Sequence, residues 1–173
     1  MGSEMCIRDR ACIVLLWGYS RYFQKQILIG NVIVALLTFL SICWLNSFNE
    51  VFNPIIYWVG GLSFFIHLIR ELVKDIEDVK GDRAFGYRTL AVYWPLLKVK
   101  ISIWCLILIL LFVMVIWQMI EWPQKMYSLG AVAYLLLVSA NKLITAQHSS
   151  QFNFVSNLLK IAMVVGVFTV FFV

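Results

Sequence analysis

Long apolar runs separated by short polar stretches dominate this chain. The runs cover residues 27–45, 55–69, 99–120, 126–140 and 157–173. A membrane-spanning helix needs about 20 mostly apolar residues, and only helices or closed barrels satisfy their backbone hydrogen bonds within lipid. The runs lack the alternation of apolar and polar positions that is typical of a barrel. The pattern therefore predicts an all-α membrane protein, a multi-span transmembrane helical bundle.

The polar stretches predict the connections between these helices. Residues 11–18 are interpreted as the end of a further helix, and polar loops are expected at 19–26, 46–53 and 142–153. Lys and Arg concentrate in alternate loops, and most of them lie between residues 70 and 100. Because basic loops stay on the cytoplasmic side, we expect the 70–100 segment to be cytoplasmic.

Composition agrees with a membrane protein and excludes several other classes. Of the 173 residues, 62% are hydrophobic and 13% are charged, whereas about 25% are charged in soluble domains. The net charge of +5 comes from residues beside the apolar runs, so it does not indicate nucleic-acid binding. The four cysteines show no pairing or spacing typical of a disulfide framework or zinc site.

One dense cluster of charge, residues 70–90, interrupts the apolar pattern. It holds five of the nine acids in the chain: Glu71, Asp75, Glu77, Asp78 and Asp82. Five basic residues lie among them: Arg70, Lys74, Lys80, Arg83 and Arg88. Because ionisable groups at a membrane boundary are costly to desolvate, such a cluster indicates a functional site.

The spacing of three of these acids indicates a particular chemistry. Asp75, Asp78 and Asp82 follow each other at i, i+3 and i+7, so on a helix they share a face. Oxygen ligands suit Mg²⁺, which keeps several waters and takes substrate phosphates as further ligands. The run therefore predicts part of a site for metal and phosphate at the end of a membrane helix.

The same residues resemble a known family. The segment from Asp78 to Asp82 resembles the second aspartate motif, DxxxD, of the UbiA-type intramembrane prenyltransferases. The wider context from Arg70 to Leu90 resembles the geranylgeranylglycerol-phosphate geranylgeranyltransferase-like branch. Upstream, Tyr19, Lys25 and the segment 30–38 resemble the connection into the fifth helix of that fold. The resemblance covers essentially all of the chain after residue 10.

The resemblance implies a nine-helix bundle around a cavity, with two aspartate-rich cytoplasmic loops. The first family motif, NDxxDxxxD, does not occur here. Residues 11–173 are therefore expected to be a C-terminal part, from the end of helix four to helix nine, that is inactive without the N-terminal helices as partner. Residues 1–10, MGSEMCIRDR, are interpreted as a non-native leader. The expected location is a bacterial inner membrane, as an integral multi-pass protein.

The chemistry that the resemblance implies is Mg²⁺-dependent transfer of an isoprenoid group from an allylic prenyl diphosphate to a lipid-precursor or aromatic acceptor. Asp78 and Asp82 would be the catalytic metal ligands, with Asp75 as an additional one. The candidate diphosphate contacts are Lys25, Lys74, Lys80, Arg83 and Arg88. Tyr19 and Asn31 are candidates for the acceptor side. Gln24 stands where the family has a basic residue, and whether Lys25 takes that role stays open.

Two other classes remain alternatives. A CDP-alcohol phosphotransferase-like enzyme also has spaced aspartates, but its motif needs glycine after the second of them, where Val79 follows Asp78. A membrane transporter fragment would place carboxylates within the spans, beside broken helices. The charged run could also be a solvated loop, His67 a packed residue and His148 a loop residue.

Overall fold

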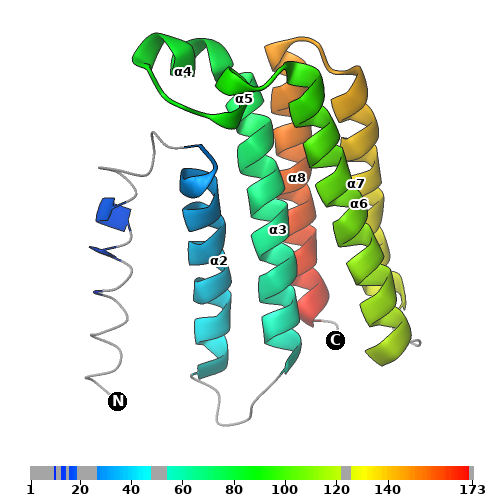
Figure 1. Ribbon diagram of the computed structural model, residues 1–173. Coiled ribbons are helices and arrows are strands. Elements are labelled where there is room, and N and C mark those ends of the chain that lie inside the picture. The colour runs from blue at the N-terminus through cyan, green and yellow to red at the C-terminus, as the bar shows by residue number, and fades with distance from the viewer. Residues whose placement is uncertain are drawn as a thin grey trace.

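The computed structural model describes residues 10, 13–14, 16–18, 27–47, 54–121 and 126–171. The regular elements in these ranges are helices: α2 (Ile29–Ser47), α3 (Pro54–Glu77), α4 (Val79–Phe85), α5 (Leu90–Tyr93), α6 (Leu96–Glu121), α7 (Met126–Thr145) and α8 (Ser149–Phe171). Five long helices run side by side, while the short α4 and α5 cross one end of the bundle (Figure 1). The predicted all-α membrane fold is confirmed. Two candidate site residues, Tyr19 and Lys25, lie outside the described residues.

Helix α3 lies in the middle of the bundle, packed against α2, α6 and α8 (Figure 1). Its apolar residues recur every three or four positions, so that one stripe enters the core. The facing helices supply matching stripes. The largest fully buried side chains are those of Ile69, Val73, Val99, Ile103, Ile107, Leu110, Leu136, Leu143, Val155 and Leu159. The core thus fixes the position of α3, which carries the predicted site at its end.

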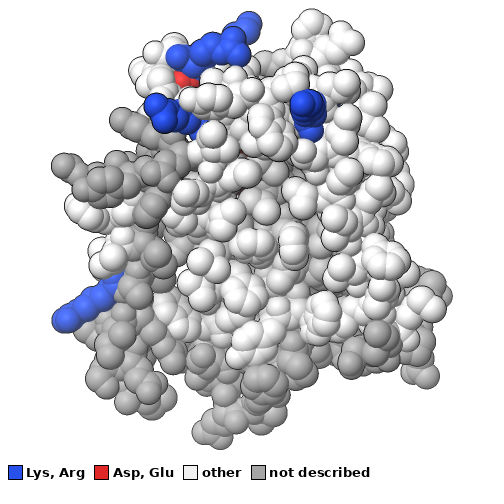
Figure 2. Space-filling view, in the orientation of Figure 1, with Lys and Arg blue, Asp and Glu red and all other residues white. Residues whose placement is uncertain are grey.

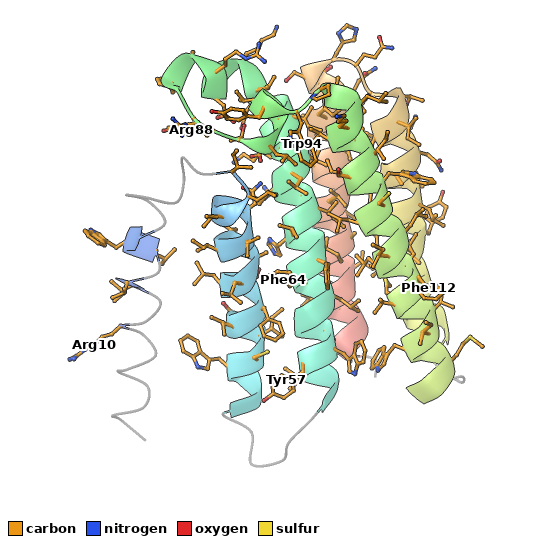
Figure 3. The ribbon with its side chains drawn as sticks, viewed as in Figure 1. Arg10, Tyr57, Phe64, Arg88, Trp94 and Phe112 are labelled. Carbon is orange, nitrogen blue, oxygen red and sulfur yellow. The ribbon has the colours of Figure 1, made fainter. Side chains whose placement is uncertain are left out.

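Among the described residues, three helices are long and apolar enough to cross a membrane: Ile56–Glu77, Leu96–Met119 and Ser149–Phe168. The apolar parts of α2 and α7 are shorter, Ile29–Trp44 and Gly130–Thr145. Large apolar side chains also cover the outside of the bundle, as Phe112 on α6 shows (Figure 3). An apolar exterior is suited to lipid, where exposure of such side chains has no hydrophobic cost.

Helices α2 and α3 approach each other closely at a glycine. A Cβ atom on Gly60 would lie 3.2 Å from the Phe39 ring and 3.5 Å from the Cys43 sulfur. Small residues at such crossings let membrane helices pack closely. The neighbouring Gly61 has open space around its Cα, so Gly60 alone of this pair is needed for the approach.

The prediction of a polar loop over residues 142–153 is wrong. Helix α7 continues to Thr145 and α8 begins at Ser149, so only residues 146–148 connect them. The Gln151 side chain accepts hydrogen bonds from the backbone N–H groups of Gln147 (2.6 Å) and His148 (3.2 Å), which caps α8. The sequence was misleading because polar side chains on the exposed side of a helix end look like a loop.

One lysine connects the start of α6 with the end of α7 and the start of α8. The Nζ atom of Lys100 on α6 donates to the carbonyl of Ile144 (3.2 Å) and to that of Ala146, at the end of α7. It also lies 5.5 Å from the centre of the Phe152 ring on α8. A cation near the C-terminus of a helix satisfies its free carbonyls and its dipole, so Lys100 has a structural role.

Candidate functional site

The first predicted metal ligand, Asp75, lies in the last turn of α3 and is half-buried. The Asn31 side-chain nitrogen on α2 donates a hydrogen bond of 2.7 Å to its Oδ2 atom. This contact joins two residues that are 44 positions apart in the sequence. The sequence suggests Asn31 as a candidate contact for the acceptor substrate. In the structure it contacts the carboxylate of Asp75 directly.

The second predicted metal ligand, Asp78, lies between the end of α3 and the start of α4. Its backbone N–H bonds to the Lys74 carbonyl (2.9 Å), and its own carbonyl accepts from the N–H of Asp82 (3.0 Å). Two helical hydrogen bonds thus continue through the bend, one that Asp78 donates and one that it accepts. The exposed Asp78 side chain does not cap α4, so its carboxylate is not engaged by the helix that follows.

The third predicted metal ligand, Asp82, lies on α4. The chain reverses its direction directly after this helix. Gly86 has a left-handed φ of 72° and the Tyr87 N–H bonds to the Asp82 carbonyl (2.8 Å), which ends α4. The reversal brings Thr89 back to the site, and its hydroxyl donates to Asp82 Oδ2 (3.1 Å). The sequence analysis missed Thr89. The glycine after a short helical stretch was the signal that could have shown it.

The environment of Asp82 has opposing effects on its pKa. Partial burial raises the pKa of this carboxyl above its usual value, and repulsion from Asp78 raises it further. The hydrogen bond from Thr89 and the charge of Lys74 act in the opposite direction, because both favour the ionised form. Lys74 is thus close enough to Asp82 for its charge to act on that carboxyl, and its role as a diphosphate contact stays a prediction.

The three aspartates form an open cluster. Asp78 and Asp82 lie close enough to Asp75 for their charges to act on it. Within the described ranges, however, no three His, Cys, Asp or Glu side chains converge closely enough to hold a metal ion by themselves. The oxygen donors fit Mg²⁺ on the condition that water and phosphate oxygens complete its shell, which is how this ion is usually bound.

The two glutamates of the charged run lie apart from this cluster. Glu71 forms an ion pair with its neighbour Arg70. Glu77 accepts a hydrogen bond of 2.8 Å from the Asn153 side chain on α8. Both glutamates are thus paired away from the three aspartates, with Arg70 and with Asn153.

The predicted basic contacts divide between two places. Arg88 extends from the connection between α4 and α5, on the side of α2 (Figure 3). Lys80 and Arg83 instead line a cavity that none of the three aspartates lines. On the face shown in Figure 2, the Lys and Arg side chains of the described residues gather at the α4–α5 end, apart from Arg10. The positive charge therefore lies at the same end as the aspartates.

Comparisons with known proteins show the family of the chain. Residues 10–164 match the UbiA prenyltransferase family. The chain is 31% identical over 141 residues to the digeranylgeranylglyceryl phosphate synthase of Methanopyrus kandleri, which covers 79% of this chain and 52% of that protein. The enzyme of the same name from Methanobrevibacter smithii is 31% identical over 171 residues, covering 92% and 60%. That from Sulfolobus acidocaldarius is 46% identical over 82 residues, covering 46% and 29%.

These matches cover only part of the relatives' length. The chain spans about half the length of the Methanopyrus kandleri relative. No solved structure matches the chain. The family match nevertheless covers most of the 173 residues, including every described aspartate of the site. The resemblance noted from the sequence is therefore confirmed, and the chain belongs to the UbiA prenyltransferase family.

Proposed function

We propose that this chain forms part of a Mg²⁺-dependent prenyltransferase, which moves an isoprenoid group from an allylic prenyl diphosphate to an acceptor. The observation that carries the proposal is the open cluster of Asp75, Asp78 and Asp82, oriented by Asn31 and Thr89, in a UbiA-family membrane bundle. The relatives named above are synthases of a glyceryl phosphate lipid. A phosphate-bearing lipid precursor is therefore the acceptor that we favour.

The residues have distinct roles in this proposal. Asp78 and Asp82 hold Mg²⁺, and Asp75 adds a further carboxylate that Asn31 keeps in place. When bound there, Mg²⁺ would supply positive charge to offset that of the diphosphate leaving group. Lys74 and Arg88 contact the diphosphate, because both lie at the aspartate end and apart from the Lys80 cavity. Lys25, Tyr19 and the acceptor contacts of Asn31 stay predictions.

The proposal extends to the rest of the active site and to its orientation. The family resemblance implies a second aspartate motif that residues 11–173 do not contain. We infer that this chain supplies one of two carboxylate clusters, and that further helices of the same enzyme complete the cavity. The basic residues around α4 support a cytoplasmic position for the site.

A binding experiment tests the site on this chain without requiring turnover. The protein in lipid nanodiscs should bind geranylgeranyl diphosphate in the presence of Mg²⁺ and lose that binding in EDTA. Asp78→Asn and Asp82→Asn should each weaken binding by at least about tenfold, since charge-assisted contacts contribute roughly 1.5–3 kcal/mol. Glu77→Gln is the matched control, because Glu77 belongs to the same run but contacts Asn153 on α8.

The outcomes separate clearly. The proposed metal site is supported if binding depends on Mg²⁺, if the two aspartate variants lose it and if the Glu77→Gln variant keeps it. Binding that does not depend on Mg²⁺, or that survives both aspartate substitutions, would contradict it. Transfer of radiolabelled prenyl groups to lipid acceptors, measured in parallel, would then identify the acceptor.

A further inference from the structure

A cavity of about 420 Å³ lies at the α4–α5 end of the bundle, apart from the aspartates. It opens between α3, α4, the start of α6 and the connection from α7 to α8. Its lining includes the basic residues Lys80 and Arg83, the polar His148, and the apolar residues Trp94, Leu96 and Phe152. Figure 3 shows Trp94 where α5 leads into α6. The cavity therefore combines basic groups with an apolar wall.

The position of this cavity relative to the membrane follows from the spans. The three candidate membrane spans found in the described part of the chain each have one end at this cavity. Glu77 ends the first span, Leu96 begins the second and Ser149 begins the third, and all three residues line the cavity. Because span ends mark the boundary of the hydrocarbon core, the cavity lies at the level of the lipid headgroups. Trp94 is suited to this depth.

The charges in the cavity favour an anion. Lys80 and Arg83 form no ion pair with a carboxylate of the described ranges. The carboxylate of Glu77 also lines the cavity, but it accepts the hydrogen bond from Asn153. Arginine presents a fork of donors that fits phosphate oxygens, and lysine binds phosphate as a compact charge. The lining thus carries two cations and one carboxylate, so its net charge is positive and favours an anion.

We propose that this cavity binds the phosphate headgroup of an anionic membrane lipid. Lys80 and Arg83 contact the phosphate. The hydrocarbon chain of the lipid packs against Leu96 and Trp94 and extends from there into the bilayer. A soluble phosphate would share the basic groups but would leave the apolar wall unused. The lipid site is separate from the aspartate cluster, and it does not depend on the prenyl transfer proposed above.

Lipid retention by the purified chain in a neutral detergent tests this inference. Native mass spectrometry would count bound phosphatidylglycerol against phosphatidylcholine. The double variant Lys80→Gln/Arg83→Gln should lose phosphatidylglycerol, by roughly fivefold for each basic residue removed. The charge-conserving variant Lys80→Arg/Arg83→Lys should retain it. The matched control Lys98→Gln/Lys142→Gln removes equal charge from exposed positions that do not line the cavity.

A second variant checks the cavity independently of these cations. Trp94→Glu places a negative charge at an exposed position of the wall and should also expel the anionic lipid. Equal loss in the Lys98→Gln/Lys142→Gln control, or equal retention of the two lipids by the unmodified chain, would overturn the proposal. Displacement of the lipid by millimolar inorganic phosphate would assign the cavity to free phosphate and overturn the lipid assignment. Circular dichroism would confirm that each variant keeps its helices.

Discussion

The amide of Asn31 on α2 donates a hydrogen bond of 2.7 Å to the carboxylate of Asp75 on α3. A half-buried carboxylate without a donor would have a substantial desolvation cost. The contact therefore positions Asp75 and at the same time joins α2 to the end of α3 that carries the site. One polar pair thus links the packing of two helices to the proposed binding of metal and diphosphate.

Replacing Asn31 by Ala should weaken Mg²⁺-dependent binding of geranylgeranyl diphosphate by about tenfold, because a hydrogen bond to a charged group contributes roughly 1.5–3 kcal/mol. Calorimetric titration would measure the change. Thr38→Ala is the control on the same helix, since the Thr38 hydroxyl bonds within α2 to the Ala35 carbonyl. Equal effects of the two substitutions would show that the Asn31 contact has no special role.

Thr89→Val removes the hydroxyl that donates to Asp82 but keeps the shape of the side chain. The Mg²⁺ concentration needed for half-maximal diphosphate binding should rise by about tenfold or more, because a hydrogen bond to a charged group contributes roughly 1.5–3 kcal/mol. Thr89→Ser restores the donor and should return the Mg²⁺ requirement to near that of the unmodified chain. A Ser variant as impaired as the Val variant would point to packing in place of hydrogen bonding.

The two adjacent glycines of α3 should respond differently to alanine. Gly61→Ala should stabilise the protein by roughly 0.5–1 kcal/mol, because alanine favours the helix and its methyl group meets open space. Gly60→Ala has the same effect on helix propensity but brings a methyl group 3.2 Å from Phe39. It should therefore be less stable than Gly61→Ala. Thermal unfolding in detergent would compare them, and equal midpoints would contradict the close approach of α2 and α3.

Lys100→Met should destabilise the bundle by about 1–2 kcal/mol, since it removes a charged donor from the carbonyls at the end of α7. Lys98→Met, two residues earlier and exposed, should have little effect. Chemical unfolding in mixed micelles gives both free energies. If the two variants unfold alike, the cap on α7 contributes nothing measurable.

The α4 end of the bundle should face the cytoplasm. In a background without native cysteines, Ala84→Cys on the exposed side of α4 should resist a thiol reagent that cannot cross the membrane, and react after lysis. Tyr57→Cys, at the opposite end of α3 (Figure 3), serves as the reference from the other side. Labelling of Ala84→Cys in intact cells would reverse the proposed orientation.

The sequence predicted the helical bundle, which the structure confirms, because the fold depends on local patterns. The metal site at the three aspartates stays a prediction from a pattern of the same kind. Apolar runs mark the spans, and the spacing of Asp75, Asp78 and Asp82 shows their common neighbourhood. It could not show that Glu77 contacts Asn153, because that pair depends on the packing of α3 against α8. The contact of Thr89 with Asp82 was missed although Gly86 marks the reversal that brings them together. The sequence also placed a loop where α7 and α8 continue, since exposed polar helix ends and loops have the same composition.

Helix α4 contains no buried residue, although it carries Asp82 and begins directly after Asp78. The buried apolar core of the bundle comes from α3, α6, α7 and α8, together with Leu90 of α5 and Ala146 between α7 and α8. Folding and ligand recognition therefore draw on different parts of the chain. Substitutions in α4 can alter affinity while the free energy of unfolding stays nearly constant, which makes this short segment the natural place to redesign the protein's choice of ligand.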